Sequence, residues 1–162
     1  MYKRQDGKIR EWDLRSNSRS PITEYVNGFN DCPCNSFDIS YFNSTLVCGY
    51  DDGRLSLFNM ENQELIFTKQ TTSRYIRKVA ILSFMGGKLP KYLYGTNDGT
   101  IGIVNYCNSE YATEQCAELT RICSGVRALA VCSSAVHGEK EIVYGGTNGE
   151  VGFIRPVPLQ LR

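Results

Sequence analysis

The chain has few of the residues and motifs that most often carry chemistry. Its 162 residues include one histidine, His137, and they contain no Gly-x-Ser-x-Gly, His-Glu-x-x-His or phosphate-loop motif. No stretch of eighteen apolar residues is present, so the sequence predicts no membrane span. With 18 basic and 17 acidic residues, the net charge of +1 gives no field strong enough to attract nucleic acid. We therefore predict that the protein is not an enzyme and uses no cofactor or metal.

Cysteines are numerous, but their spacing is not that of a metal or redox motif. Seven are present without a Cys-x-x-Cys pair, and the closest two are Cys32 and Cys34. Zinc would need two further ligands, and His137 lies far away in the sequence. We predict free thiols, with a metal or redox site at Cys32 and Cys34 as the alternative. The N-terminal sequence MYKRQDGK lacks the apolar run of a secretory signal, which predicts a cytoplasmic or nuclear location.

One pattern occurs four times along the chain: a tight turn containing Asp-Gly or Asn-Gly, followed by an alternating apolar strand. The four turns are separated by 46, 46 and 50 residues, and in three copies an apolar strand ending in glycine precedes the turn (TLVCGY, KYLYGT, EIVYGG). A further strand precedes each of these three. Such regular spacing indicates an internal repeat. The turns are Asp6-Gly7, Asp52-Gly53, Asp98-Gly99 and Asn148-Gly149.

The repeated unit is predicted to be a four-stranded antiparallel sheet. Its third strand carries apolar residues on both faces, as in Leu55, Leu57 and Phe58, which favours a sheet buried between two neighbours. Sheets of this size that repeat at this period and stack face to face form a β-propeller. A single domain over 1–162 is predicted, with about three blades and a spare strand. The units lie approximately at 1–30, 31–70, 74–120 and 124–158.

The outer strand of the third unit is less clear than the others. Outer strands are predicted at 22–26 and 64–68 in the first two units. In the third unit an outer strand with an irregular insertion is favoured, because the third strand needs a partner at its edge. The alternative is a short helix near 109–123, since apolar residues recur there at helical spacing.

The first repeat, DGKIREWDL, resembles the third strand of WD40-repeat blades, which ends in Trp-Asp. Here the dipeptide is Trp12-Asp13, and Trp12 follows the turn residue Asp6 by six residues, which is the spacing of that family. The strand pattern resembles the family over nearly the whole chain, although only the first copy has the dipeptide and none of the predicted first strands follows the family's Gly-His. The resemblance implies an all-β, partial WD40-like β-propeller that acts as a scaffold for protein–protein interaction.

About three blades are fewer than the roughly 4–8 blades of closed propellers. We therefore expect that the chain is a fragment of a longer one or that a second copy completes the ring, and that the isolated chain is unstable or self-associates. Other proteins are the expected partners, with no membrane and no nucleic acid.

The loop that enters each first strand is expected to share a face with the hairpin turn. Two arginines, Arg77 and Arg127, hold matching positions in this loop region and can bind an acidic or phosphorylated peptide through bidentate hydrogen bonds. The alternative is that they are ordinary solvated residues. The full predicted partner-binding set is Arg77, Arg127, Tyr50, Asp51, Thr96, Asn97, Gly146 and Thr147.

Two alternative functions remain open. The residues Trp12, Asp13 and Arg15 resemble the WDxR box with which substrate receptors of cullin-based ubiquitin ligases contact their adaptor. By that resemblance Arg15 is the contact residue, on the opposite face. The run SRYIRK at 73–78 combines cations with an aromatic ring, which is typical of RNA-associated proteins and is the second alternative.

Overall fold

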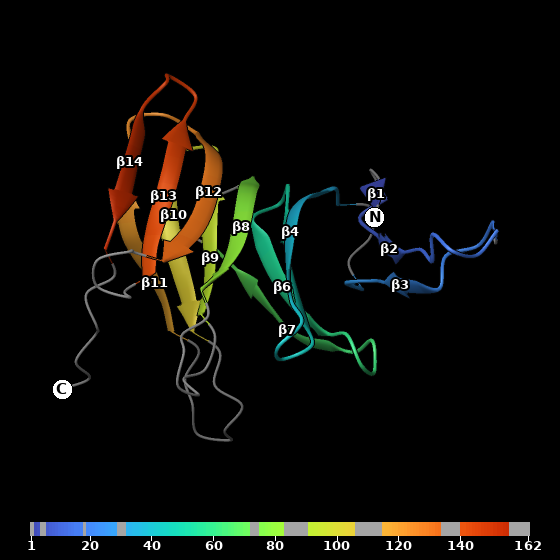
Figure 1. The fold of residues 1–162 in the computed structure, drawn as a ribbon. Coiled ribbons are helices and arrows are strands. Elements are labelled where there is room, and N and C mark those ends of the chain that lie inside the picture. The colour runs from blue at the N-terminus through green and yellow to red at the C-terminus, as the bar shows by residue number, and fades with distance from the viewer. Residues whose placement is uncertain are drawn as a thin grey trace.

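The protein is all-β in the residues that its computed structural model describes, which are 2–3, 6–17, 19–28, 32–71, 75–82, 91–105, 115–133 and 140–155. The strands in these ranges form four antiparallel sheets, and the sheets follow one another in chain order (Figure 1). No helix occurs in the described ranges, and so none that could cross a membrane.

Each sheet is a meander, because its strands pair in the order in which the chain runs through them. The first sheet contains β1 (Tyr2–Lys3), β2 (Ile9–Glu11) and β3 (Thr23–Tyr25). The second contains β4 (Cys34–Ser40), β5 (Thr45–Tyr50), β6 (Arg54–Asn59) and β7 (Leu65–Gln70). The third contains β8 (Ile76–Leu82), β9 (Lys91–Thr96), β10 (Thr100–Asn105) and β11 (Gln115–Arg121). The fourth contains β12 (Val126–Ser133), β13 (Lys140–Gly146) and β14 (Val151–Ile154).

The four repeated turns form as the sequence predicts. Their glycines, Gly7, Gly53, Gly99 and Gly149, have φ values between 70° and 89°, a conformation that glycine adopts at little cost. In the first, second and fourth sheets, the side chain before the glycine accepts a hydrogen bond from the backbone N–H two residues further on. In the third sheet, the N–H of Thr100 donates to Thr96 Oγ1 at 3.0 Å. Asp52 Oδ1 accepts from the N–H of Arg54 at 3.0 Å, and Asn148 Oδ1 accepts from the N–H of Glu150 at 3.0 Å. Asp6 acts in the same way, since its Oδ1 accepts from the N–H of Lys8 at 3.2 Å.

The two middle sheets bury both of their faces, as predicted from the apolar pattern of the third strands. On β5, Val47 packs toward the third sheet, whereas its neighbour Leu46 packs toward the first. On β9, Tyr94 packs toward the second sheet and its neighbour Leu93 packs toward the fourth. Successive side chains of a strand point to opposite faces, so each apolar run serves two layers. Three apolar layers therefore separate the four sheets.

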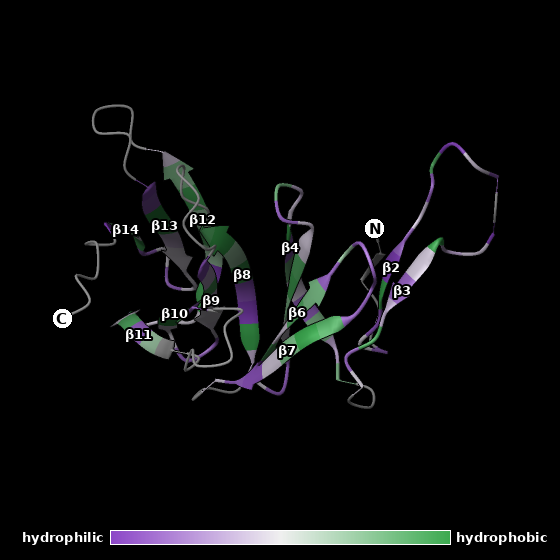
Figure 2. Ribbon diagram, turned by 90° about the horizontal axis from the view of Figure 1, so that it is seen from below, coloured by the Kyte–Doolittle hydropathy of each residue, from purple (hydrophilic) through white to green (hydrophobic). Residues whose placement is uncertain are grey.

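The first strands β4, β8 and β12 lie next to one another, and the sheets spread from them in an arc (Figure 2). Two side chains of β4 join it directly to β8. Asp38 Oδ2 accepts a hydrogen bond from the N–H of Ile81 at 2.8 Å, and Ser36 Oγ accepts from the N–H of Val79 at 3.2 Å. The second and third sheets are thus connected by hydrogen bonds as well as by apolar packing.

The third unit has a strand where the sequence left a short helix as the alternative. The strand β11 pairs along all of β10, from Thr100 opposite Arg121 to Asn105 opposite Gln115. A helix there would leave the outer N–H and C=O groups of β10 without strand partners. The outer strand is therefore confirmed for 115–121, and residues 109–114 lie outside the described ranges.

Candidate partner-binding face

Each of the three first strands contains a β-bulge at its second residue. In β4, β8 and β12 the register shifts between the first and third residues, so Asn35, Arg77 and Arg127 have no opposite residue on the neighbouring strand. A bulge re-aims the extra side chain and strengthens the local twist. The repeat therefore places one re-aimed side chain at the start of each first strand.

In the second, third and fourth sheets, the hairpin turn is hydrogen-bonded to the loop that enters the first strand. Because this bond recurs, the turns and the entering loops share one face of the molecule, as the sequence predicts. The N–H groups of Asp51, Asn97 and Thr147 donate to the carbonyls of Pro33, Tyr75 and Gly125 at 3.0, 3.0 and 2.9 Å. We call this the turn face and define it by these six residues together with Asn35, Arg77 and Arg127.

Arg77 is held in place on the turn face by two neighbours. Its Nε donates to Asn97 Oδ1 at 3.2 Å, and its guanidinium lies 5.7 Å from the centroid of the Tyr75 ring. Tyr75 is 46% exposed and has a φ of 60°, a left-handed conformation that is uncommon outside glycine. Its N–H donates to the carbonyl of Asp51 at 3.0 Å, which connects the second sheet to the third.

Asn35 is the matching residue of the second sheet, and the sequence prediction did not include it. Its Nδ2 donates to the Asp51 carboxylate and to the carbonyl of Ile76, the latter at 3.1 Å. Asn35 therefore links two sheets and does not project into solvent. Its position was visible in the sequence, because CNSFDIS, IRKVAIL and VRALAVCS align with Asn35, Arg77 and Arg127 in second place.

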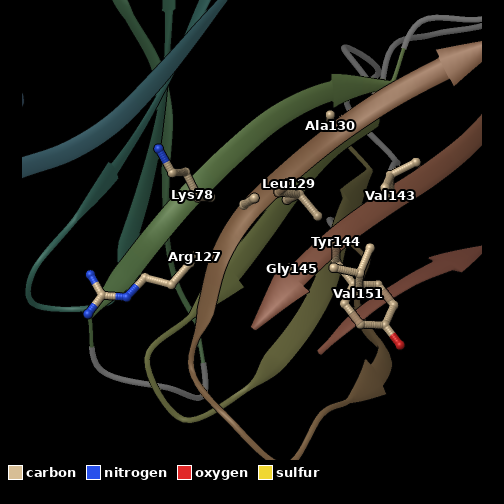
Figure 3. Close-up of a pocket in the computed structure, with 9 residues that line it drawn as sticks. Lys78, Arg127, Leu129, Ala130, Val143, Tyr144, Gly145 and Val151 are labelled. Atoms are coloured by element: carbon tan, nitrogen blue, oxygen red, sulfur yellow. The ribbon is translucent and has the colours of Figure 1, made fainter. Parts of the chain in front are cut away.

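Arg127 is exposed and borders a hollow of about 340 Å³, which Lys78, Gly145 and Val151 also line. Figure 3 shows Arg127 and Lys78 extending from β12 and β8 on one side of this hollow, opposite Val151. A second hollow, of about 400 Å³, lies between the first strands and is lined by Asp38 and Lys78 among others. Two cations, Arg127 and Lys78, thus stand at the border between the turn face and the first strands.

Two residues of the predicted partner-binding set are not accessible. Tyr50 and Thr96 are each 0% exposed, because they end β5 and β9 with their side chains inside the sheet packing. The Thr96 hydroxyl donates to the carbonyl of Thr100 at 3.1 Å, and burial raises the pKa of Tyr50 above its ordinary value. The sequence prediction is wrong about the accessibility of both. Asn97 and Thr147 are exposed, and Asp51, Arg77 and Gly146 are half-buried.

The WDxR residues follow β2 directly, at the end of the strand away from its turn. The backbone N–H and the Nε of Arg15 both donate to Asp13 Oδ1, at 2.9 and 3.2 Å, and the Arg15 side chain is 94% exposed. Trp12 is half-buried, and its Nε1 is buried without a hydrogen-bond partner. Asp13 thus closes a short turn that presents Arg15 to solvent.

The remaining candidate residues are only partly described. Of the run at 73–78, residues 73 and 74 lie outside the described ranges, as does His137.

Burial raises the pKa of the Cys32 and Cys48 thiols, so both favour the neutral form. Where the structure describes the chain, no three His, Cys, Asp or Glu side chains gather as metal ligands would. Free thiols are found at Cys32, Cys34, Cys48, Cys123 and Cys132.

No known protein-family model matches the chain, and no curated protein matches it significantly. A function therefore has to be inferred from the chain's own repeat and from the side chains that the repeat brings together.

Proposed function

We propose that the protein is a β-propeller scaffold of the WD-repeat type that binds partner proteins on its turn face. The observation that supports this proposal is the bulge at the second residue of β4, β8 and β12. A bulge interrupts regular pairing, and its recurrence at a matched position gives the turn face a row of re-aimed polar side chains. Rigid sheets that hold such residues next to loops are a common basis for binding.

The chemistry of this row fits an acidic or phosphorylated peptide. Arg77 uses its Nε on Asn97, which leaves its two terminal amino groups for a ligand. Arg127 is exposed, and Lys78 stands beside it at the same hollow. Arginine binds carboxylate and phosphate groups through paired hydrogen bonds, so two arginines on neighbouring first strands favour an extended anionic partner.

The proposal is tested by titrating the protein with acidic peptides and with their phosphoserine counterparts. Hydrogen bonds to charged groups contribute about 1.5–3 kcal/mol, so Arg77→Ala and Arg127→Ala should each weaken binding by about 10- to 100-fold. Lys140→Ala is the matched control, because it removes a half-buried cation at the opposite end of the fourth sheet. Binding that survives both arginine substitutions and is lost with Lys140→Ala would contradict the proposal.

A second candidate function is that of a substrate receptor for a cullin-based ubiquitin ligase. The observation that favours it is the 94% exposure of Arg15, which Asp13 holds in a short turn beyond β2. A pull-down with the propeller adaptor of the ligase would compare the wild type with Arg15→Ala. Capture of the wild type alone is the expected result, and equal capture of both proteins would remove this candidate.

A further inference from the structure

The fourth sheet has the residues of a buried interface but is uncovered on one side. We call the side of each sheet that faces the next sheet in chain order its downstream face. In the last three sheets, the residues three and five positions after the turn Asp or Asn are apolar and point to this face. Their side chains are at most 2% exposed in the second and third sheets. In the fourth sheet they are 76% and 64% exposed. The positions hold Leu55 and Leu57 in the second sheet, Ile101 and Ile103 in the third, and Val151 and Phe153 in the fourth.

The glycine that precedes each turn by three residues shows the same difference. A methyl group on Gly49 would stand 2.8 Å from Cγ1 of Val79, and one on Gly95 would stand 2.5 Å from Cγ1 of Val126. Each of these glycines therefore receives a β-branched side chain from the first strand of the next sheet. At Gly145 the nearest side-chain atom is Cβ of Ala128, at 3.4 Å and in the same sheet. The hollow of about 340 Å³ lies at this glycine (Figure 3).

The first sheet is incomplete on its opposite side, which we call its upstream face and define by Arg10 and Trp12. Six residues after the turn Asp or Asn, the later sheets place an apolar side chain against the preceding sheet, and Trp12 holds this position in the first sheet. Both Trp12 Nε1 and Arg10 Nη1 are buried without a hydrogen-bond partner. These two donor atoms are covered by the chain itself, whereas the Trp12 side chain as a whole is only half-buried, so part of it is still open on this face.

We propose that the downstream face of the fourth sheet docks on the upstream face of the first sheet of a second copy of this chain. Inside the chain, each sheet stacks its downstream face on the upstream face of the next one. In the described part of the chain, the faces of Phe153 and Trp12 are the two that no other sheet covers.

Each of the two faces carries charged side chains. Glu141 lies opposite Cys132 on the downstream side of the fourth sheet, where its Oε1 accepts a hydrogen bond from Arg155 Nε at 2.8 Å. On the first sheet, Arg10 forms an ion pair with Glu24. Lys8 adds a further cation to the first sheet. Because the two surfaces differ, the contact is heterologous, and it closes a ring or continues from copy to copy according to its rotation.

The test measures mass by light scattering across a range of protein concentrations. The wild type should associate, and Phe153→Asp should return it to the mass of one chain. Trp12→Ala should do the same from the other face, and Lys8→Glu is the milder variant if Trp12→Ala does not fold. Phe42→Asp is the matched control, since Phe42 is 96% exposed in the turn after β4 and should leave association unchanged.

Mixing the two defective variants separates this contact from every symmetric one. In a mixture, the intact first sheet of Phe153→Asp can meet the intact fourth sheet of Trp12→Ala, so one junction and a two-chain species should return. A wild type that stays monomeric at all concentrations overturns the proposal, and so does association that persists in Phe153→Asp. The proposal is also overturned if Trp12→Ala and Lys8→Glu still associate, because such association would pair the fourth sheets of two copies. Capture of a different protein by a wild type that stays monomeric would overturn it as well.

Discussion

The two middle sheets and the two end sheets share one local pattern and differ in what surrounds them. Leu57 on β6 and Phe153 on β14 both lie five residues after their turn residue, yet they are 0% and 64% exposed. The sequence pattern determines the strand and the direction of each side chain, whereas the neighbouring sheet decides whether that side chain is buried. Apolar residues at matched positions are therefore evidence of a shared architecture and not of equal contributions to stability.

The largest expected effect compares these two positions directly. Leu57→Ala should lower the free energy of unfolding by about 2–5 kcal/mol, because it leaves a cavity between the second and third sheets. Phe153→Ala should change it by about 0.5 kcal/mol or less, since most of that side chain is already in water. Urea unfolding at a concentration where the chain is monomeric measures both. Similar losses for the two variants would show that a cover for Phe153 is present in the monomer.

A smaller difference is expected between the turns of the third and fourth sheets. Gly99 and Gly149 have φ values of 89° and 85°, so alanine at either position is strained by about 1–2 kcal/mol. A methyl group on Gly99 would also stand 2.8 Å from the carbonyl oxygen of Ser124, whereas nothing lies within 4 Å of one on Gly149. Gly99→Ala should therefore destabilise the protein more than Gly149→Ala in thermal unfolding. Equal shifts in Tm would mean that conformation alone sets the cost.

The smallest expected effect concerns the polar outer face of the first sheet. A hydrogen bond from Arg10 Nε, at 2.5 Å, lowers the pKa of Glu24 below its ordinary value of 4.5. Because the folded state favours the carboxylate, this stabilisation is complete above the ordinary pKa and disappears as the pH falls through the lowered one. Glu24→Gln should make Tm less sensitive to pH between about pH 5 and pH 3. An unchanged acid dependence would show that the ion pair does not contribute.

The turns and strands were predictable from the sequence because their signals are local. Asp-Gly specifies a tight turn with a positive φ, and alternating apolar residues specify a strand with two buried faces. The third unit was harder, because Cys116, Leu119 and Cys123 also fit helical spacing. The free edge of β10 favours a strand there, and edge pairing is a tertiary effect that a local pattern does not contain.

The candidate site was only partly predictable. Arg77 and Arg127 were identified from their matching positions, but the bulge that re-aims them inserts one residue without any compositional mark. Tyr50 and Thr96 were misjudged because they adjoin the turns in sequence while their side chains point into the sheets. Adjacency along the chain predicts which face a residue approaches, and its accessibility depends on strand direction and register.

The meander order of the strands has a consequence for dividing the chain. Every hydrogen-bonded ladder in the described residues joins strands that are consecutive in the sequence, and none crosses from one sheet to another. A break between β7 and β8 would therefore sever no ladder, and each half would keep two whole sheets. The halves would lose the apolar layer around Val47, Tyr92 and Tyr94 and the hydrogen bonds between the second and third sheets, among them those that Ser36 and Asp38 accept. Two separately expressed halves should then recognise each other through that layer and reassemble without a covalent link.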